Sequence, residues 1–515
     1  MKKIYHIFLL TFIVVVAGCN RLDDNQASPQ SELNQDVLVQ KSATVAVPKE
    51  LAYNRQDLDN KIITLQSERK DFHWEWTDMR TLWSAASLTN QVVLGYKPAN
   101  IENIDPIIHQ LNLQSKEWKS VHDALLDLVL KGLNKNGQTV TLNDIIVEDD
   151  QVLPILVLRV TDKDVLTQLF NLKNVRYIEP YGYWPAAWND RSSSGCSGST
   201  TTVNAADFTT ITPGCKLPWD FNNVNIPTAW NTAQGEGIRI GVIDAGISSS
   251  QTLLGSMFND GMSNVGRSIT TDYTYGTSAY TSCTHGTSMA GLAAGPRNAQ
   301  NATTGVAYKA NLHFIRGCDD VVLDASAELS GVKNALIRMG DLNDIKIISM
   351  SIGTPFSSGT LKDGVTYAYN KGKLIFAAAG TSFSWTSWWG VIYPAALSQC
   401  QAVTGVKESG STCSDCHDGS QVDFTIPMQR NASSNRTSLS LAPSGFNSNY
   451  IGGSSCATAI TAGIAGVIWS VKPTLTRAQI ITAMQQTAQY YPSPNSSRGY
   501  GNINAGAAVA LASTY

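Results

Sequence analysis

The sequence predicts an α/β protein in which a mostly parallel sheet has helices on both faces, preceded by a smaller α/β domain. Three apolar runs rich in β-branched residues carry this prediction, at 238–243, 345–352 and 374–379. Runs of this kind are typical of strands that are buried on both faces. Helical stretches such as 325–339 alternate with them, as the crossover connections of a parallel sheet require.

The composition narrows the classes of protein to consider. The chain has 515 residues, of which 43% are hydrophobic and 15% are charged. Thirty-eight Lys and Arg oppose 41 Asp and Glu, which gives a formal net charge of −3. This balance argues against nucleic-acid binding, which needs a basic surface, and against an acidic disordered chain. The length predicts two to four domains.

The N-terminus has the features of an export signal. Two lysines precede an apolar run over 7–17, which is too short for a membrane-spanning helix. The run ends in Val-Ala-Gly-Cys, which resembles a bacterial lipobox with Cys19 as the lipid-bearing residue. We therefore expect a lipoprotein signal peptide over 1–18 and a membrane anchor on Cys19. The alternative is an ordinary signal with a chance cysteine.

A polar stretch follows the expected lipid anchor. Residues 19–48 are rich in Ser, Gln, Asn and Asp, which predicts a flexible tether. Asn20, in place of Asp, resembles the signal for sorting to the outer membrane. We therefore expect the protein in the bacterial cell envelope, on the outer membrane, and leave the periplasmic or outer face open.

Residues 49–185 predict a small α/β domain, because short apolar runs alternate with helical patterns. The expected elements are a helix over 120–133, a short helix capped by Thr161 or Asp162, and strands at 92–96, 152–158 and 175–180. Residues 186–220 are irregular and rich in Ser, Thr and Gly, so a linker is expected there. The larger domain then occupies 221–515.

Eight cysteines follow Cys19, an even number that permits up to four disulfides in an exported chain. The sequence alone cannot choose among the pairings. Cys196 and Cys215 bracket most of the linker, and we expect a disulfide between them.

Three short segments carry side chains that could take part in catalysis. Asp244 ends the strand Gly-Val-Ile-Asp, and active sites of open parallel sheets lie at such strand ends. His285 opens a helix of small residues. Ser455 opens an apolar helix, where free N–H groups can stabilise an oxyanion. Each signal alone has a structural interpretation, as a cap, a turn residue or a buried histidine.

In the order Asp, His, Ser, the three segments together resemble the subtilisin-like serine peptidases. Other segments of the larger domain are similar to family motifs, namely 305–307, 349–353, 377–380, 393–396 and 499–504. The resemblance implies that Ser455 is the nucleophile, that His285 is the general base and that Asp244 orients the imidazole. It also implies the residues that bind substrate: Ser351, Ile352, Gly353, Ala378 and Gly380.

The oxyanion hole departs from the family pattern. The resemblance implies a side-chain donor at Thr381, where the family usually has Asn, together with the backbone N–H of Ser455. A Thr hydroxyl is shorter and can rotate away, and losing one such donor costs about 10²–10³ in kcat. Trp385, Trp388 and Trp389 follow, and either cap the core or line the specificity pocket or a peptide groove.

The small domain is similar to the family's inhibitory propeptide. This resemblance implies an intramolecular inhibitor over 49–185, a monomeric enzyme, and protein or peptide substrates. No cofactor is expected, and calcium, which often binds this family, has no legible ligand cluster in the sequence.

In the layout that the resemblance implies, Cys283 and Cys318 flank the substrate cleft, so a disulfide between them is expected. Cys456 is expected to pack as a small hydrophobe. Residues 413–417 read Cys-Ser-Asp-Cys-His, which fits the pattern for c-type haem attachment. Their polar surroundings favour a disulfide-bearing loop with Cys400 as a partner, and zinc lacks a clear fourth ligand.

We therefore expect a lipid-anchored serine endopeptidase that is made as a proenzyme. Two alternatives stay open: a catalytically weak or inactive peptide-binding protein of the same fold, and a specialised peptide-processing protease. A c-type haem protein comes last, and a visible absorption spectrum would detect it.

Overall fold

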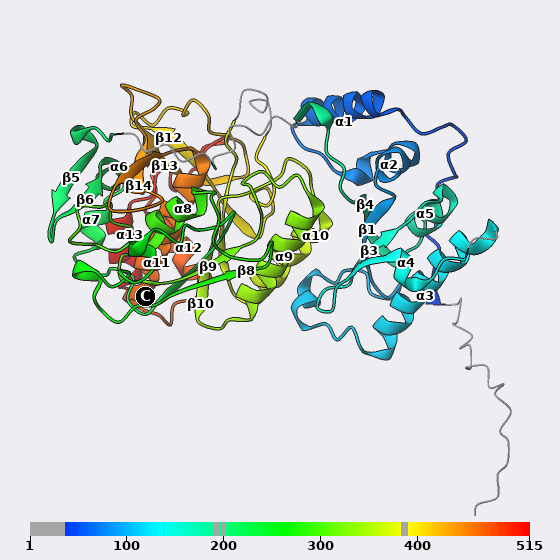
Figure 1. The fold of residues 1–515 in the computed structure, drawn as a ribbon. Coiled ribbons are helices and arrows are strands. Elements are labelled where there is room, and N and C mark those ends of the chain that lie inside the picture. The colour runs from blue at the N-terminus through cyan, green and yellow to red at the C-terminus, as the bar shows by residue number, and fades with distance from the viewer. Residues whose placement is uncertain (1–36, 137–138, 189–195, 197–201, 383–389) are drawn as a thin grey trace, which may run out of the picture.

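The structure is a computed structural model, and it describes residues 37–136, 139–188, 196, 202–382 and 390–515. A small N-terminal domain lies beside a larger domain and faces its helices α9 (Ser326–Asp341) and α10 (Gly359–Asn370) (Figure 1). The expected signal peptide, the lipidation site Cys19 and the tryptophans Trp385, Trp388 and Trp389 lie outside the described residues.

The small domain is an antiparallel sheet of order β2-β3-β1-β4 with helices packed against it. Its core is formed by apolar residues at the predicted spacing, and Asp162 caps α5 by accepting bonds from two backbone N–H groups. The elements are α1 (Arg55–Arg69), α2 (Met79–Ala86), β1 (Gln91–Tyr96), α3 (Lys116–Leu133), α4 (Leu142–Ile145), β2 (Ile146–Asp149), β3 (Ile155–Arg159), α5 (Lys163–Phe170) and β4 (Val175–Pro180).

The predicted tether is wrong at its C-terminal end, because residues 37–48 lie against the small domain. The backbone N–H of Val39 donates to Asn174 Oδ1 at 2.8 Å, and that of Val45 donates to Asn171 Oδ1 at 2.9 Å. These Asn side chains satisfy backbone groups that composition alone assigned to solvent.

The larger domain contains the expected parallel sheet, in the order β13-β12-β11-β10-β7-β9-β8. Every pairing between these strands is parallel, as the buried apolar runs predict. The strands are β7 (Arg239–Asp244), β8 (Ile269–Tyr273), β9 (Asn311–Arg316), β10 (Ile345–Met350), β11 (Leu374–Ala378), β12 (Cys400–Lys407) and β13 (Val422–Gln429).

Helices cover both faces of this sheet and divide the core in two. Side chains of α8 (His285–Ala294) and α11 (Gly453–Val471) join one apolar cluster, and those of α9 and α10 join the other. Helix α11 has the length and hydropathy of a membrane-crossing helix, but it lies buried inside the domain. The other helices are α6 (Trp219–Asn223), α7 (Ile226–Ala229), α12 (Arg477–Gln486) and α13 (Ala505–Ala512).

The expected linker is only partly irregular, because a hairpin forms within it. Strands β5 (Phe208–Ile211) and β6 (Cys215–Pro218) pair, as do β14 (Ser438–Leu441) and β15 (Ser448–Ile451) further along the chain. Asp207, at the start of the hairpin, is buried and bonds Arg430, Arg436 and the Tyr450 hydroxyl. The described residues from 202 onward therefore pack as part of the larger domain.

The disulfides differ from those expected. Cys196 pairs with Cys283 and Cys413 pairs with Cys416, so the pairings Cys196–Cys215 and Cys283–Cys318, and a bond from the 413–417 loop to Cys400, are wrong. Cys215, Cys318 and Cys400 are free thiols buried in the core of the larger domain. Cys456 is also a buried free thiol, as predicted. Both sulfurs of the 413–417 motif are bonded to each other, so the motif is a disulfide-bearing loop, as the favoured interpretation predicts.

Candidate active site

Asp244, His285 and Ser455 come from three different elements of the larger domain. Asp244 ends β7, His285 opens α8, and Ser455 lies in the first turn of α11. The parallel sheet brings the ends of its strands to one edge, where ligand sites of open α/β sheets form.

His285 and Asp244 form a buried hydrogen-bonded pair. His285 Nδ1 lies 2.8 Å from Asp244 Oδ1, and the side chains are 4% and 0% exposed. The Ala245 N–H also donates to Asp244 Oδ1, which fixes the carboxylate. Burial alone would lower the pKa of His285, but the charge of Asp244 and its hydrogen bond outweigh it and raise that pKa above 6.5.

Ser455 lies near free backbone N–H groups at the start of a helix, which could stabilise an oxyanion formed when its hydroxyl attacks a carbonyl. It is in the first turn of α11, whose backbone N–H groups have no partners within the helix. Its hydroxyl donates to Ser351 O at 3.3 Å, and the Ser351 hydroxyl donates to Ser455 O at 3.0 Å. To donate to His285, the Ser455 hydroxyl must first release Ser351 O, and catalytic hydrogen bonds often form only when substrate binds.

The segment Gly380–Thr381 is bonded to the start of α11. The Gly380 N–H donates to Ser454 Oγ at 3.1 Å, and the Ser454 N–H donates to Thr381 Oγ1 at 3.2 Å. The two hydroxyls also lie 3.1 Å apart. A Cβ on Gly453, which has φ of +74°, would come within 2.5 Å of Thr381 Oγ1, so only glycine permits this approach. Thr381 thus lies beside the helix that carries Ser455.

The residues expected to bind substrate line the same edge, but part of the cleft is closed. Ser351 and Ile352 follow β10 directly, and Ala378 is the last residue of β11. The Gly353 N–H donates to Val321 O at 2.9 Å, and Gly353 O accepts from the Leu323 N–H at 2.8 Å. A peptide that pairs with Gly353 must first displace residues 321–323.

Two features of this region were not predicted as part of the site. Cys196 reaches Cys283, two residues before His285, through a disulfide. His417 lies against Gly380, and its N–H donates to Gly380 O at 3.0 Å. The Cys-x-x-Cys-His motif was visible in the sequence, but nothing in its polar surroundings indicated contact with residues 380–382.

Within the ranges that the structure describes, no group of three or more His, Cys, Asp or Glu side chains offers a metal site. The described residues therefore offer no candidate site for the calcium that the family often binds.

The model of the subtilase family matches residues 235–502 of this chain. Thermitase from Thermoactinomyces vulgaris is 29% identical over 286 residues, which are 56% of this chain and 93% of that protein. A thermostable alkaline protease from Halalkalibacterium halodurans is 31% identical over 310 residues, 58% of this chain and 75% of that protein.

Among solved structures, fervidolysin from Fervidobacterium pennivorans, described as a keratinolytic enzyme related to subtilisin, has a TM-score of 0.56 to this chain. It is 18% identical and aligns with 82% of this chain and 60% of its own, so it supports the fold alone. The family model covers the strands and helices that carry Asp244, His285 and Ser455. The chain belongs to the subtilase family and is a subtilisin-like serine endopeptidase.

Proposed function

We propose that this endopeptidase is made as a lipid-anchored proenzyme and hydrolyses peptide bonds through Asp244, His285 and Ser455. The observation that carries the assignment of residues is the buried His285–Asp244 pair at 2.8 Å, set at the same sheet edge as the α11 N-terminus with Ser455.

The chemistry follows from this arrangement. The Ser455 hydroxyl attacks the scissile carbonyl carbon while His285 takes its proton, and the resulting acyl-enzyme forms when His285 passes that proton to the leaving amine. Water then attacks the acyl-enzyme by the same route and releases the second product. Asp244 holds the ring so that Nε2 faces the reaction, and it stabilises the imidazolium that forms.

The oxyanion would be held by donors at the α11 N-terminus. The Ser455 N–H is one of the helix N–H groups without an intrahelical partner, and we assign the Thr381 hydroxyl as the side-chain donor. The Ser454 N–H already donates to Thr381 Oγ1, so that oxygen is fixed close to the helix start.

Residues 49–185 are proposed to inhibit the enzyme until they are removed. Arg176 of β4 forms two hydrogen bonds with Asp363 of α10, at 3.0 and 2.5 Å. Lys333 of α9 is fully buried and pairs with Glu148 and Asp150 of the small domain. Charges from the two domains therefore neutralise each other across an interface in which Lys333 and Asp363 are buried.

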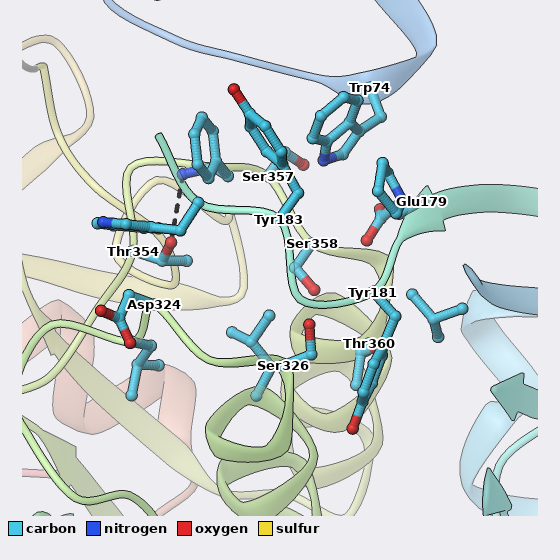
Figure 2. A pocket seen from close by; sticks show the side chains of 16 residues that line it. Trp74, Glu179, Tyr181, Tyr183, Asp324, Ser326, Thr354, Ser357, Ser358 and Thr360 are labelled. Atoms are coloured by element: carbon cyan, nitrogen blue, oxygen red, sulfur yellow. Dashed lines mark hydrogen bonds between the residues drawn. The ribbon is translucent and has the colours of Figure 1, made fainter. Parts of the chain in front are cut away.

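An aromatic cluster supports the same role. Phe356 of the larger domain stacks on Trp188 with ring centroids 5.4 Å apart, and Trp184 and Phe72 meet it edge-on at 5.6 and 5.1 Å. A cavity of about 40 Å³ lies beside this cluster. Side chains of both domains line it, as Figure 2 shows: Trp74, Glu179, Tyr181 and Tyr183 from the small domain, and Ser326, Ser358 and Thr360 from the larger one.

The small domain also binds the chain on either side of the expected substrate pocket. The Ser357 N–H donates to Phe72 O at 2.9 Å, and the Tyr393 hydroxyl donates to Asp71 Oδ1 at 2.9 Å. Bound there, the small domain would limit the access of protein substrates to the site between residues 353 and 393.

We also propose that Cys19 carries a lipid anchor and that the protein lies on the outer membrane. The lipobox supports the anchor, and Asn20 supports the outer-membrane location. Radiolabelled palmitate should be incorporated into the full chain, and a Cys19→Ala variant should incorporate none.

Replacement of Ser455 tests the assignment of the nucleophile. We expect Ser455→Ala to lower kcat by about 10⁶, because removal of the nucleophile disables the whole triad. Cleavage of a fluorogenic peptide by full chain, with and without the substitution, measures the loss. Near-normal proteolysis by the variant would refute the triad.

A second function, peptide binding without turnover, is favoured by one observation: Thr381 stands where the family usually has Asn. Binding of a peptide by a full chain whose serine reacts with no fluorophosphonate would support it.

A further inference from the structure

We propose that His417 is a positioning residue for the oxyanion segment Gly380–Ser382, held in place by the disulfide turn Cys413–Cys416. This inference rests on the proposed function, because it assumes that the oxyanion forms beside Thr381.

The disulfide turn pairs with the oxyanion segment through the backbone. Thr381 and Cys416 form an antiparallel bridge, and the Ser382 N–H donates to Asp415 O at 2.5 Å. On the other side of the bridge, the His417 N–H donates to Gly380 O at 3.0 Å. Residues 380–382 are therefore held along their length by a turn that the Cys413–Cys416 bond closes.

The His417 ring contacts the backbone at two separate points, Gly380 and Gly390. At Gly380, φ is +124°, and a Cβ there would lie 2.3 Å from His417 Nδ1, so the ring packs directly on that backbone. The same nitrogen lies 2.9 Å from Gly390 O and donates to it. His417 thus connects residue 380, next to the oxyanion donor, with residue 390, next to the motif at 393–396.

The ring itself is held firmly and uncharged. His417 is 4% exposed, its carbonyl accepts from the Thr404 hydroxyl, and burial lowers its pKa. Its Nε2 has no hydrogen-bond partner among the described residues. A fixed neutral imidazole keeps the Nδ1–H that Gly390 O requires, and it adds no positive charge beside the reacting groups.

The alternative is that His417 only fills space in the core. The two roles differ in what they do to catalysis, because a displaced oxyanion donor weakens the transition state and leaves substrate binding largely intact. A peptide aldehyde, which forms a tetrahedral adduct with an active serine, reports on the oxyanion hole. The alcohol of the same peptide cannot form this adduct and reports on binding alone.

The test measures full chain that has been allowed to process itself, with competent serines counted by fluorophosphonate titration. We expect His417→Ala to lower kcat by about 10–100-fold and to weaken aldehyde binding by a similar factor. KM and alcohol binding should change by less than about threefold, since uniform binding is retained. His417→Asn can still donate to Gly390 O and should recover most of the loss, whereas His417→Phe keeps only the packing and should not.

His313→Ala is the matched control, because His313 lies in β9, is 7% exposed and also has an Nε2 without a described partner. We expect it to leave kcat per titrated serine unchanged. If His417→Ala retains its kcat and aldehyde affinity, or if Phe replaces His without loss, the inference is overturned.

Should His417→Ala fail to fold, the Asn and Phe variants decide in the same way. Failure of all three to fold, with His313→Ala intact, would assign His417 to the fold and overturn the inference. If the parent enzyme itself is not labelled at Ser455, the proposed function fails, which is a different result.

Discussion

In the proposed mechanism, the pairing of His285 with Asp244 determines the pH at which Ser455 can be activated. The pKa of His285 is raised above 6.5, and only the neutral ring can accept the proton of Ser455. Activity should therefore be low below this pKa, rise with pH through it, and level off above it. The profile of kcat/KM between about pH 5 and about pH 9 measures this rise.

Asp244→Asn removes the charge that raises the pKa, so the rise in activity should move to lower pH. We expect kcat to fall by about 10⁴ as well, because the ring loses the partner that orients it. A midpoint that does not move in the variant, or a parent profile that is flat with chemistry rate-limiting, would contradict the assignment of His285 as the base.

Residue identity was enough to propose Asp244, His285 and Ser455 as a triad, but not to predict what surrounds them. The three residues lie next to secondary-structure boundaries that the sequence pattern indicates, and their catalytic roles stay a proposal. His417 approaches Gly380 only because a turn formed 33 residues later in the chain bends back onto it. No local pattern encodes such a contact.

The proposed oxyanion segment contains a departure from the family pattern, Thr381 in place of the usual Asn. Thr381 Oγ1 accepts from the Ser454 N–H and lies 3.1 Å from Ser454 Oγ, so its proton can point to the oxyanion or to Ser454. We expect Thr381→Val to lower kcat by about 10²–10³, the loss that follows removal of one oxyanion donor. Thr381→Asn should keep or raise kcat, because an amide N–H₂ reaches further.

Single-turnover hydrolysis of a peptide ester measures both Thr381 variants without interference from product release. A harmless Thr381→Val substitution would show that Thr381 is not in the oxyanion hole.

At the scale of elements, the sequence pattern predicted the strands and helices but not the disulfide pairings. The strands and helices lie close to their expected ranges because buried faces impose a period that is legible in the sequence. The disulfides were wrong since a pairing depends on how far-apart segments pack. Cys215 lies in β6 with its side chain buried in the core, and this burial raises the pKa of its thiol to about 11. Cys196 forms its disulfide with Cys283 instead. The hairpin β5–β6 was missed because polar Ser and Thr dominate its surroundings.

In the proenzyme that we propose, the interface between the domains controls when activity appears. Arg176→Ala would leave the Asp363 side chain, which is 1% exposed, without its charged partner. Truncating one partner of a buried pair weakens an interface by about 2–5 kcal/mol. The lag before proteolysis appears should therefore shorten in the full-length variant.

Lys119→Ala provides the control, because Lys119 pairs with Asp123 on the exposed surface of α3 within the small domain. It should leave the lag unchanged, since exposed pairs contribute little. Equal lags for the two variants would show that the Arg176–Asp363 contact does not hold the inhibitor in place.

At the scale of the whole molecule, the parallel sheet, two large core clusters and a docked small domain explain why the site is assembled but not open. The sheet brings the proposed catalytic side chains to one edge. The small domain and the pairing of Gly353 with residues 321–323 limit the access of a substrate to them. The domain order is predicted from composition shifts and stays a prediction. The closure of the site was not predicted, because it depends on contacts between segments that are remote in sequence.

The most direct test of the account is reaction of the full chain with a fluorophosphonate after the small domain has been removed by self-processing, followed by mass spectrometry of the labelled peptide. We predict that the label lies on Ser455 and that Ser455→Ala carries none. An unlabelled but folded and processed enzyme, or a label on another serine, would contradict the assignment of the nucleophile.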